Sequence, residues 1–356
     1  MNKQIVLIPG DGIGPEIIAA AQAVLTKAAA KSGIQFTFET HLAGGAAIDA
    51  YDTPLPGKTL AAVRRADAIL LGAVGGPQWD QVSPEIRPEK AILGLRKELG
   101  LYANLRPVRV PAVTANYSTL KPEIVTGVDV LIVRELNGGI YYGERMEAGM
   151  VEGREQAWDT ESYSRPEIER ILRLACQVAR KRRNKVTSVD KANVLASSRL
   201  WRKTAGQVAQ EYDDVRIDHM YVDNCAMQLV LSPKQFDVVV TSNLFGDILS
   251  DEAAVLTGSI GMLPSASLGD GPGLYEPIHG SAPDIAGQGI ANPIGTILSA
   301  ALLMRHSFGA EAAAGQIEAA VERSLADGYR TADLYQPGLT KLSTEEMGRK
   351  ILENLR

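Results

Sequence analysis

Residues 4–15 read QIVLIPGDGIGP, and this stretch decides the fold class. Ile5–Ile8 is a continuous apolar run, which is typical of a strand buried on both faces of a parallel sheet. A glycine-rich loop follows, and Pro15 begins a helix, where its missing N–H costs nothing. The alternation of strand and helix continues along the chain, so the sequence predicts an α/β fold with flanking helices.

The middle of the chain has a different pattern from its two ends. Residues 102–110 and 128–135 predict long strands, and residues 165–182 predict an amphipathic helix. Between them, residues 144–161 are polar with alternating character, so we expect an arm that pairs with another chain. The last third is rich in Gly and Pro as far as Pro293, and from there we expect helices.

Composition excludes several classes of protein. The chain has 37 Lys and Arg against 42 Asp and Glu, with no basic tail, which argues against a general nucleic-acid binder. No stretch approaches the roughly 20 apolar residues of a membrane helix, and we expect no membrane association. The start has no signal-peptide plan, and Cys176 and Cys225 lie far apart, so we expect a cytoplasmic protein without disulfides.

Carboxylates with the spacing of metal ligands occur after two predicted strands. Asp247 and Asp251 are four residues apart, which places both on one face of a helix, where a hard cation such as Mg²⁺ or Mn²⁺ would relieve their repulsion. A solvated helix face is the structural alternative. Asp223 begins another helix, and its alternative role is an N-cap.

Basic residues in unusual positions suggest an anionic substrate and a base. Arg106 and Arg134 lie in apolar strands and Arg96 lies nearby in sequence, and guanidinium groups bind carboxylates bidentately. Structural ion pairing, for example of Arg134 with Glu135, is the alternative. Lys191 follows a predicted strand and could act as a base if its surroundings lowered its pKa, although a lysine there is more often simply exposed.

Two glycine-rich loops are candidates for phosphate or nucleotide binding. Residues 10–15 match neither the spacing of the Rossmann fingerprint nor a Walker loop, so this signal alone is weak. Residues 279–287 offer backbone N–H groups and an acidic side chain that could hold an adenosine diphosphate moiety. By composition, an ordinary surface loop explains them equally well.

Together these segments resemble the metal-dependent β-decarboxylating dehydrogenases, the isocitrate/isopropylmalate dehydrogenase family. The resemblance covers essentially the whole chain and is carried by residues 10–16, 95–107, 133–143, 189–195, 243–261, 263–268 and 279–293. It implies a two-domain α/β fold with mixed sheets and no Rossmann arrangement. We expect residues 1–101 with 258–356 to form the cofactor domain, and residues 102–257 to form the domain that carries the arm and makes the dimer.

The resemblance also implies a role for individual residues, in four groups. These are the substrate carboxylate clamp Arg96, Arg106 and Arg134; the Mg²⁺ or Mn²⁺ ligands Asp223, Asp247 and Asp251, with Asp223 also near the substrate; the acid/base pair Tyr141 and Lys191; and the NAD loop His279, Gly280, Ser281, Ala282, Pro283, Asp284, Ile285 and Asn292. The family is dimeric, with Lys191 and Asp223 contributed to each site by the second subunit.

The resemblance also implies that a short segment before the first arginine selects the substrate. Ile92 and Leu93 suit an isopropyl group, and Glu89 would repel the third carboxylate of isocitrate. We therefore expect oxidative decarboxylation of 3-isopropylmalate to 4-methyl-2-oxopentanoate and CO₂ with reduction of NAD, a reaction of leucine biosynthesis. One alternative is a sibling enzyme acting on homoisocitrate, tartrate, malate or isocitrate. The other is a non-catalytic binding protein, which would need no acid/base pair such as Tyr141 and Lys191.

Overall fold

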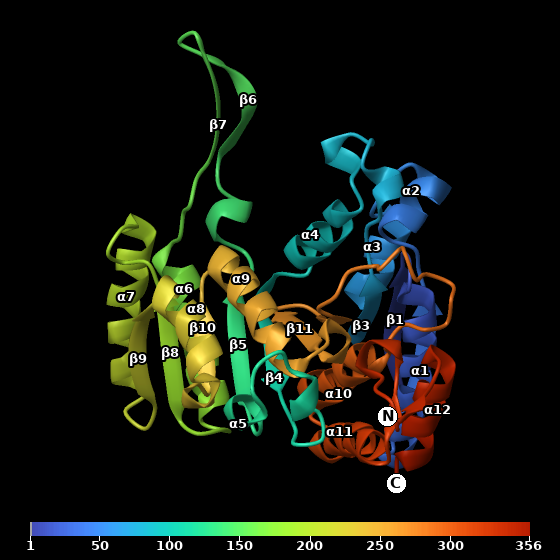
Figure 1. Cartoon of the computed structure of the whole chain (residues 1–356). Helices are drawn as coiled ribbons and strands as arrows, with labels where there is room; N and C mark the ends of the chain where they lie inside the picture. Colours follow the sequence, from blue (N-terminus) through green and yellow to red (C-terminus); the bar gives the residue numbers. More distant parts are fainter. Residues whose placement is uncertain (1) are drawn as a thin grey trace. The chain divides into compact units, whose positions relative to one another are not determined.

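The computed structural model describes residues 2–356 and divides into two compact units (Figure 1). Unit 1 contains the chain up to Leu101, Pro111–Thr119 and Thr257–Arg356, so it combines both ends of the chain. Unit 2 contains Tyr102–Val110 and Leu120–Leu256.

The division differs from our expected boundary at Pro111–Thr119, which we had placed with the middle of the chain and which groups with unit 1. The reason is local packing. A Cβ added to Gly258 would lie 2.4 Å from the carbonyl oxygen of Tyr117, and Nε of Arg330 donates a 2.8 Å hydrogen bond to the Tyr117 hydroxyl. Contacts with the C-terminal part of the chain therefore hold this loop in unit 1.

Unit 1 is built on a mixed sheet. Strand β1 lies between β2 and β3 and is parallel to both, β12 is parallel to β3, and β11 is antiparallel to β12. The strands span Asn2–Gly10 (β1), Gln35–Thr40 (β2), Ala68–Ala73 (β3), Pro264–Gly269 (β11) and Gly273–Pro277 (β12).

Strands β11 and β12 lie in the part rich in Gly and Pro before Pro293, where we expected no particular element. Pro264 and Pro277 lie opposite each other at one end of this ladder, and glycines end β11 and begin β12. Pro and Gly are uncommon inside strands. The sequence pattern therefore did not indicate the six-residue β11 and the five-residue β12.

Helices cover the sheet of unit 1. Helix α1 begins at Gly14 with Pro15 in its first turn, as the sequence predicted, and it packs against α10 and α12. The helices span Gly14–Lys31 (α1), Gly45–Tyr51 (α2), Gly57–Arg65 (α3), Glu89–Glu98 (α4), Ile294–Phe308 (α10), Glu311–Ala326 (α11) and Thr344–Asn354 (α12), and two short strands, β13 and β14, span Tyr329–Arg330 and Thr340–Lys341.

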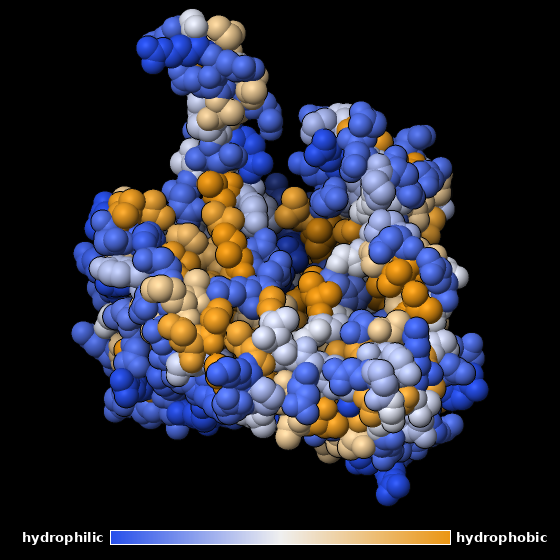
Figure 2. All heavy atoms as spheres, viewed as in Figure 1, coloured by the Kyte–Doolittle hydropathy of each residue, from blue (hydrophilic) through white to orange (hydrophobic). Residues whose placement is uncertain are grey.

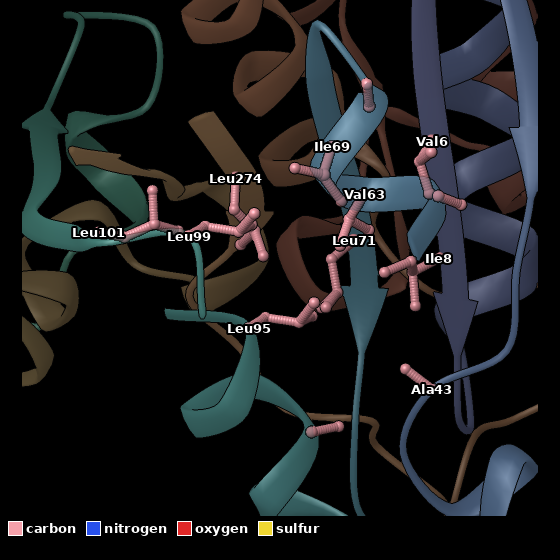
Figure 3. Close-up of a cluster of buried hydrophobic side chains, with 13 residues drawn as sticks. Val6, Ile8, Ala43, Val63, Ile69, Leu71, Leu95, Leu99, Leu101 and Leu274 are labelled. Carbon is pink, nitrogen blue, oxygen red and sulfur yellow. The ribbon is translucent and has the colours of Figure 1, made fainter. Parts of the chain in front are cut away.

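A buried apolar cluster connects α4 to the sheet of unit 1 (Figure 3). Ile8, Leu71 and Leu274 come from β1, β3 and β12, and Leu95 comes from α4. Each of these four side chains is at most 1% exposed, so burial of apolar area fixes α4 on the sheet.

Unit 2 contains five strands that pair in the order β4-β5-β10-β8-β9. Strand β4 is antiparallel to β5, and the remaining pairs are parallel, which agrees with the predicted α/β class of mixed sheets with flanking helices. The strands span Leu101–Arg109 (β4), Asp129–Glu135 (β5), Lys185–Asp190 (β8), Arg216–Tyr221 (β9) and Val238–Thr241 (β10), and the helices span Pro122–Val125 (α5), Arg165–Ala179 (α6), Ala196–Val208 (α7), Val222–Leu231 (α8) and Asn243–Ala254 (α9).

The polar stretch before α6 forms an antiparallel hairpin of β6 (Arg145–Val151) and β7 (Arg154–Asp159). All of β7 is exposed, and the hairpin projects from the rest of unit 2 (Figure 1). The predicted arm is therefore a two-stranded ribbon, and its pairing with another chain stays a prediction. In the described part of the chain, no helix has the length and apolar character needed to cross a bilayer.

Candidate active site

The buried arginines of unit 2 lie on one face of the β4–β5 pair. Arg106 is opposite Ile132, two residues before Arg134 on β5, so the two guanidinium side chains emerge on the same side. Arg134 pairs with Asp247, and its Nε donates to Oδ1 of Asn243 at 3.0 Å. The alternative of structural ion pairing is therefore present, with Asp247 as the acid, whereas Glu135 accepts from Gly138 and Arg170.

Helix α9 supplies the acceptors for these arginines. Its start follows Thr241, which pairs with Arg134 in the sheet, so the first turns of the helix lie beside the end of β5. Arg106 lies 3.5 Å from Asp247 and 3.3 Å from Asp251, and it also donates to Oγ of Ser250 at 2.6 Å. The carboxylates therefore share one helix face, as their spacing predicted.

Asp247 and Asp251 have the donor chemistry that a hard divalent cation requires. Both are carboxylates, and the side chain of Asp251 is 61% exposed. Burial, and then the nearby charge of Asp247, raise the pKa of Asp251, although Arg106 lowers it. Arg106 thus compensates part of the repulsion between two like charges four residues apart, and a bound cation would compensate more of it.

Tyr141 joins this cluster from the short turn Gly139–Tyr141 (η4). Its hydroxyl donates to Oδ2 of Asp247 at 2.7 Å, and the guanidinium carbon of Arg134 lies 5.6 Å from its ring centroid. Burial and the Asp247 carboxylate raise the pKa of Tyr141. The phenol therefore stays protonated at neutral pH and can serve as a proton donor.

Two acidic residues that we did not predict hold the Tyr141 turn. Glu135 accepts hydrogen bonds from the N–H groups of Asn137 at 3.0 Å and Gly138 at 2.7 Å, and Glu161 accepts one from Ile140 at 2.7 Å. Glu135 ends an apolar strand, and a buried acid must have partners, so its position was a usable signal. Glu161 lies in a polar stretch and gave no such signal.

Asn243 is a second residue that the sequence did not indicate. Its amide nitrogen donates to the carbonyl oxygens of Leu136 and Gly138 at 3.2 Å, and its oxygen accepts from Arg134. One buried amide thus connects α9, the end of β5 and the loop before Tyr141. An asparagine at the start of a helix is usually a simple cap, which hides this function.

Lys191 and Asp223 form a separate pair. They follow β8 and β9, and Asp190 of β8 lies opposite Tyr221 of β9, so Nζ of Lys191 reaches Oδ1 of Asp223 at 2.5 Å. The hydrogen bond from Lys191 lowers the pKa of Asp223. The cap of α8 is Tyr221, so Asp223 lies in the first turn and the N-cap alternative is wrong.

The backbone around Lys191 is held by buried groups. Asp190 accepts two hydrogen bonds from Arg202, at 2.9 and 2.8 Å, and one from the N–H of Ala192 at 2.9 Å. The N–H of Lys191 donates to Oγ of Ser198 at 3.0 Å. These contacts orient the lysine without touching its amine.

The three predicted metal ligands do not come together in one chain. Within residues 2–356 no group of three or more His, Cys, Asp and Glu side chains is arranged to hold a metal ion. Asp247 and Asp251 contact Arg106, whereas Asp223 contacts Lys191.

In unit 1 the predicted substrate residues lie on α4. Glu89 is exposed in the first turn, Leu93 is half-buried, and Ile92 packs partly against the apolar cluster of Figure 3. Arg96 lies 3.2 Å from Glu276, and its buried Nε has no hydrogen-bond partner within the described residues. Arg96 therefore keeps a donor for a ligand.

The loop of residues 279–287 combines open backbone with an unpaired ring nitrogen. His279 shares a 2.9 Å hydrogen bond between Nδ1 and the oxygen of Gly280, whereas its buried Nε2 has no partner among residues 2–356. Burial lowers the pKa of His279, so the imidazole is neutral. Gly280 has open space beside it, and Asp284 is exposed, so the loop can accept a nucleotide.

The remaining residues of this loop have structural contacts. Ile285 and Ala282 pack against Ile13, and Pro283 is exposed. Asn292 is buried, and its amide donates to Asp333 at 2.9 Å and accepts from the N–H of Ile294 at 3.0 Å. Asn292 therefore also fixes the start of α10.

Residues 4–351 match the family model described as isocitrate/isopropylmalate dehydrogenase, and the chain belongs to this family. Relatives named 3-isopropylmalate dehydrogenase include those of Moorella thermoacetica, 59% identical over 99% of both chains, and Pseudomonas fluorescens, 57% identical over 100% of this chain and 99% of the relative.

Solved structures support the same family. The crystal structure of isocitrate dehydrogenase from Methylococcus capsulatus has a TM-score of 0.87 and 38% identity, and it covers 99% of each chain. The apo form of a β-decarboxylating dehydrogenase from Thermococcus kodakarensis has a TM-score of 0.81 and 39% identity, over 99% of this chain and 96% of that one.

Proposed function

We propose that this chain oxidises and decarboxylates 3-isopropylmalate to 4-methyl-2-oxopentanoate and CO₂, with reduction of NAD, in leucine biosynthesis. The single observation that carries the chemistry is the cluster of Arg106, Arg134, Asp247 and Tyr141, because it combines anion binding, cation binding and a proton donor. The names of relatives at 56–59% identity support the choice of substrate. We place this biosynthetic enzyme in the cytoplasm.

Substrate binding is assigned to the three arginines. Arg106 and Arg134 are nearly buried and already hold carboxylates of α9, so a substrate carboxylate finds preorganised bidentate donors. Arg96 in unit 1 has a free Nε donor for the same role. Rearrangement of the Asp247 contact on substrate binding would release the Arg134 guanidinium group.

Asp247 and Asp251, together with Asp223 of a second copy of the chain, would hold Mg²⁺ or Mn²⁺. When bound, the ion would supply stabilisation of negative charge on the C2 oxygen, and NAD would supply the hydride acceptor. Lys191 can take the proton of the C2 hydroxyl only as the neutral amine, which would still donate a hydrogen bond to Asp223 and be held in place by it. After CO₂ leaves, Tyr141 delivers a proton to C3 from its neutral phenol.

Selectivity for the substrate is assigned to α4. The exposed carboxylate of Glu89 repels a third substrate carboxylate, and Leu93 with the free side of Ile92 contacts an isopropyl group. An apolar contact of this kind discriminates by only about 1–3 kcal/mol, so charge repulsion by Glu89 contributes the larger part of the rejection of isocitrate.

NAD is assigned to residues 279–285 and Asn292 of unit 1. The unpartnered Nε2 of His279 and the open space at Gly280 fit a ligand with donors and acceptors. Asp284 is exposed and would bond the ribose hydroxyls, and its charge would repel the 2′-phosphate of NADP. We therefore propose NAD as the preferred cofactor.

We also propose a homodimer formed through unit 2. Helices α8 and α9 expose large apolar side chains, and in Figure 2 apolar residues gather over the region of these helices. An exposed apolar surface of this kind indicates a protein interface, and a second copy is the simplest occupant. The exposed residues are Met227, Val230 and Leu231 of α8, Ile248 of α9, and Val255 directly after α9.

The test is a substrate and cofactor panel with purified protein. We expect nicotinamide reduction with 3-isopropylmalate, NAD and Mg²⁺ or Mn²⁺, loss of activity on chelation with EDTA, and kcat/KM at least about 10²-fold lower for isocitrate or for NADP. Equal kcat/KM values for isocitrate and 3-isopropylmalate would instead support the alternative of a sibling enzyme. Binding of 3-isopropylmalate without turnover would leave only a binding protein.

A further inference from the structure

The loop of residues 10–15 has no part in the function proposed above, although it is the sharpest glycine pattern at the start of the chain. In the structure its N–H groups are committed internally. Asp11 donates to the oxygen of Ala73 at 2.8 Å, Ile13 to that of Ser281 at 2.9 Å, and Gly14 to that of Asp11 at 2.9 Å. These three groups cannot cradle a phosphate, so the loop has another purpose.

The carboxylate of Asp11 is 4% exposed and accepts three backbone hydrogen bonds. Oδ2 accepts from Gly45 at 2.8 Å and Gly75 at 2.7 Å, and Oδ1 accepts from Ala46 at 2.7 Å. Gly45 and Ala46 begin α2, and Gly75 lies in the loop after β3. Burying a carboxylate costs free energy of desolvation. The three charge-assisted hydrogen bonds offset this cost at Asp11.

A closed ring of hydrogen bonds connects Asp11 to the candidate NAD loop. Gly75 donates its N–H to Asp11 and accepts at its carbonyl oxygen from Oγ of Ser281 at 2.7 Å. The oxygen of Ser281 accepts from the N–H of Ile13, two residues after Asp11. Gly12 makes this approach possible, because a Cβ there would lie 2.0 Å from the oxygen of Ser281.

We propose that Asp11 is a positioning residue for the cofactor: through Gly75 and Ser281 it fixes the loop of residues 279–287 in the conformation that binds NAD. This inference rests on the proposed role of that loop. Asp11 does not touch the nucleotide. Its removal should therefore weaken cofactor binding and leave the charged cluster of unit 2 unchanged.

The primary test is Asp11→Asn. The amide has one acceptor oxygen, so at least one of the two carboxylate positions loses its acceptor and places an NH₂ group against a backbone N–H. We expect the Kd of NADH, measured by fluorescence titration, to rise about tenfold, as loss of one such bond implies. KM for NAD should rise in parallel, with kcat at saturating NAD within about twofold of wild type.

Asp237→Asn is the matched control. Asp237 is a buried carboxylate of unit 2, 1% exposed, which accepts from Nε of Arg182 and the N–H of Arg183, both at 2.8 Å. This variant should lower the melting temperature without changing the Kd of NADH. A stability role alone predicts that both variants lose stability and that neither changes the Kd of NADH; that result would overturn the inference.

Ser281→Ala tests the same ring without changing a charge. It removes the bond from Oγ of Ser281 to Gly75 and keeps Asp11 in place, so it carries the test if Asp11→Asn does not fold. We expect a several-fold rise in the Kd of NADH, and an unchanged Kd would contradict the ring. If both single variants fold, their combined effect should be less than the product of the single effects, because both act through Gly75.

The outcomes separate the inference from the proposed function. If wild-type protein does not bind NADH, the proposed function fails. If wild-type protein binds NADH and Asp11→Asn binds it equally well, only the positioning role of Asp11 is lost.

Discussion

The candidate site of unit 2 is made of side chains, whereas the candidate site of unit 1 is made mainly of backbone groups. In unit 2 the site consists of charged side chains that emerge from strands and a helix, such as Arg134 of β5 and Asp247 of α9. In unit 1 the candidate cofactor site consists of loops whose backbone groups bond each other and one buried carboxylate, Asp11. The first kind of site can be located by residue type, whereas the second depends on conformation.

This difference leads to different sensitivities. A side-chain site loses its chemistry when one charged group is removed, because the remaining charge stays buried without a partner. A backbone site tolerates changes of side chain but fails where a glycine gives way to a larger residue. Four predictions test this contrast, beginning with the largest effect.

The first prediction concerns the division of the charged residues of unit 2 between Lys191–Asp223 and the Arg106–Asp251 cluster. Lys191→Ala and Asp251→Asn should each give a nearly inactive protein. Unfolded together and refolded as an equal mixture, they should recover about a quarter of wild-type activity, because half of the dimers are then mixed and each mixed dimer has one intact site.

Refolded wild-type protein is the control for this experiment and must regain its activity in parallel. If one chain contained a complete site, every site in the mixture would carry one of the two changes. No recovery alongside fully recovered wild type would therefore rule out the shared site.

The second prediction is for Arg134→Met. This change removes one partner of Asp247 and the contact with the ring of Tyr141, so kcat/KM should fall by about 10³-fold. The free energy of unfolding should fall by about 1–2 kcal/mol, because Asp247 is partly exposed and keeps its contacts with Arg106 and Tyr141. Arg180→Met, which breaks an exposed pair with Asp214, is the control and should leave both unchanged. Similar effects of the two changes would remove the distinction between buried and exposed pairs.

The third prediction concerns the backbone of unit 1. Gly10 has φ +72°, and an added Cβ would lie 1.8 Å from the oxygen of Ala73, so Gly10→Ala should cost about 3 kcal/mol of unfolding free energy. Gly309 has φ +62° with no atom within 4 Å of such a Cβ, so Gly309→Ala should cost only about 1 kcal/mol. Denaturation by urea measures both, and equal losses would show that close packing at Gly10 adds nothing.

The fourth prediction has the smallest expected effect. It concerns a backbone N–H group of unit 2, that of Ile140, which donates to Glu161. Glu161→Ala leaves the N–H of Ile140 without its acceptor and loosens the turn that carries Tyr141. We therefore expect kcat to fall about tenfold, with KM for 3-isopropylmalate unchanged. Glu161→Gln keeps an acceptor oxygen and should retain most of the activity. Equal losses in the two variants would mean that the charge of Glu161, rather than this hydrogen bond, is what matters.

The sequence predicted those parts of the fold and site that depend on residue type. Apolar runs located β1, β3 and β5, and the spacing of Asp247 and Asp251 placed them correctly on one helix face. The pairing of Lys191 with Asp223 was not predicted from spacing, because it depends on β8 and β9 being neighbours in the sheet.

The parts that the sequence did not predict depend on the environment of ordinary residues. Strands β11 and β12 are bracketed by Pro and Gly, and Asn243 looks like a simple cap. Glu161 becomes informative only when the N–H of Ile140 is seen to face it. Such contacts join residues far apart in the chain, and residue type alone does not encode them.

The sheet of unit 1 also determines how this chain can fold during synthesis. Strand β3 pairs with β1 on one side and with β12 on the other, and β12 is made about 200 residues later. A nascent chain that already contains β3 and all of unit 2 therefore has an open, buried-type edge on β3 until β12 has been synthesised. Open edges of this kind promote aggregation, so chains that end after unit 2 but before β12 should depend most on chaperones.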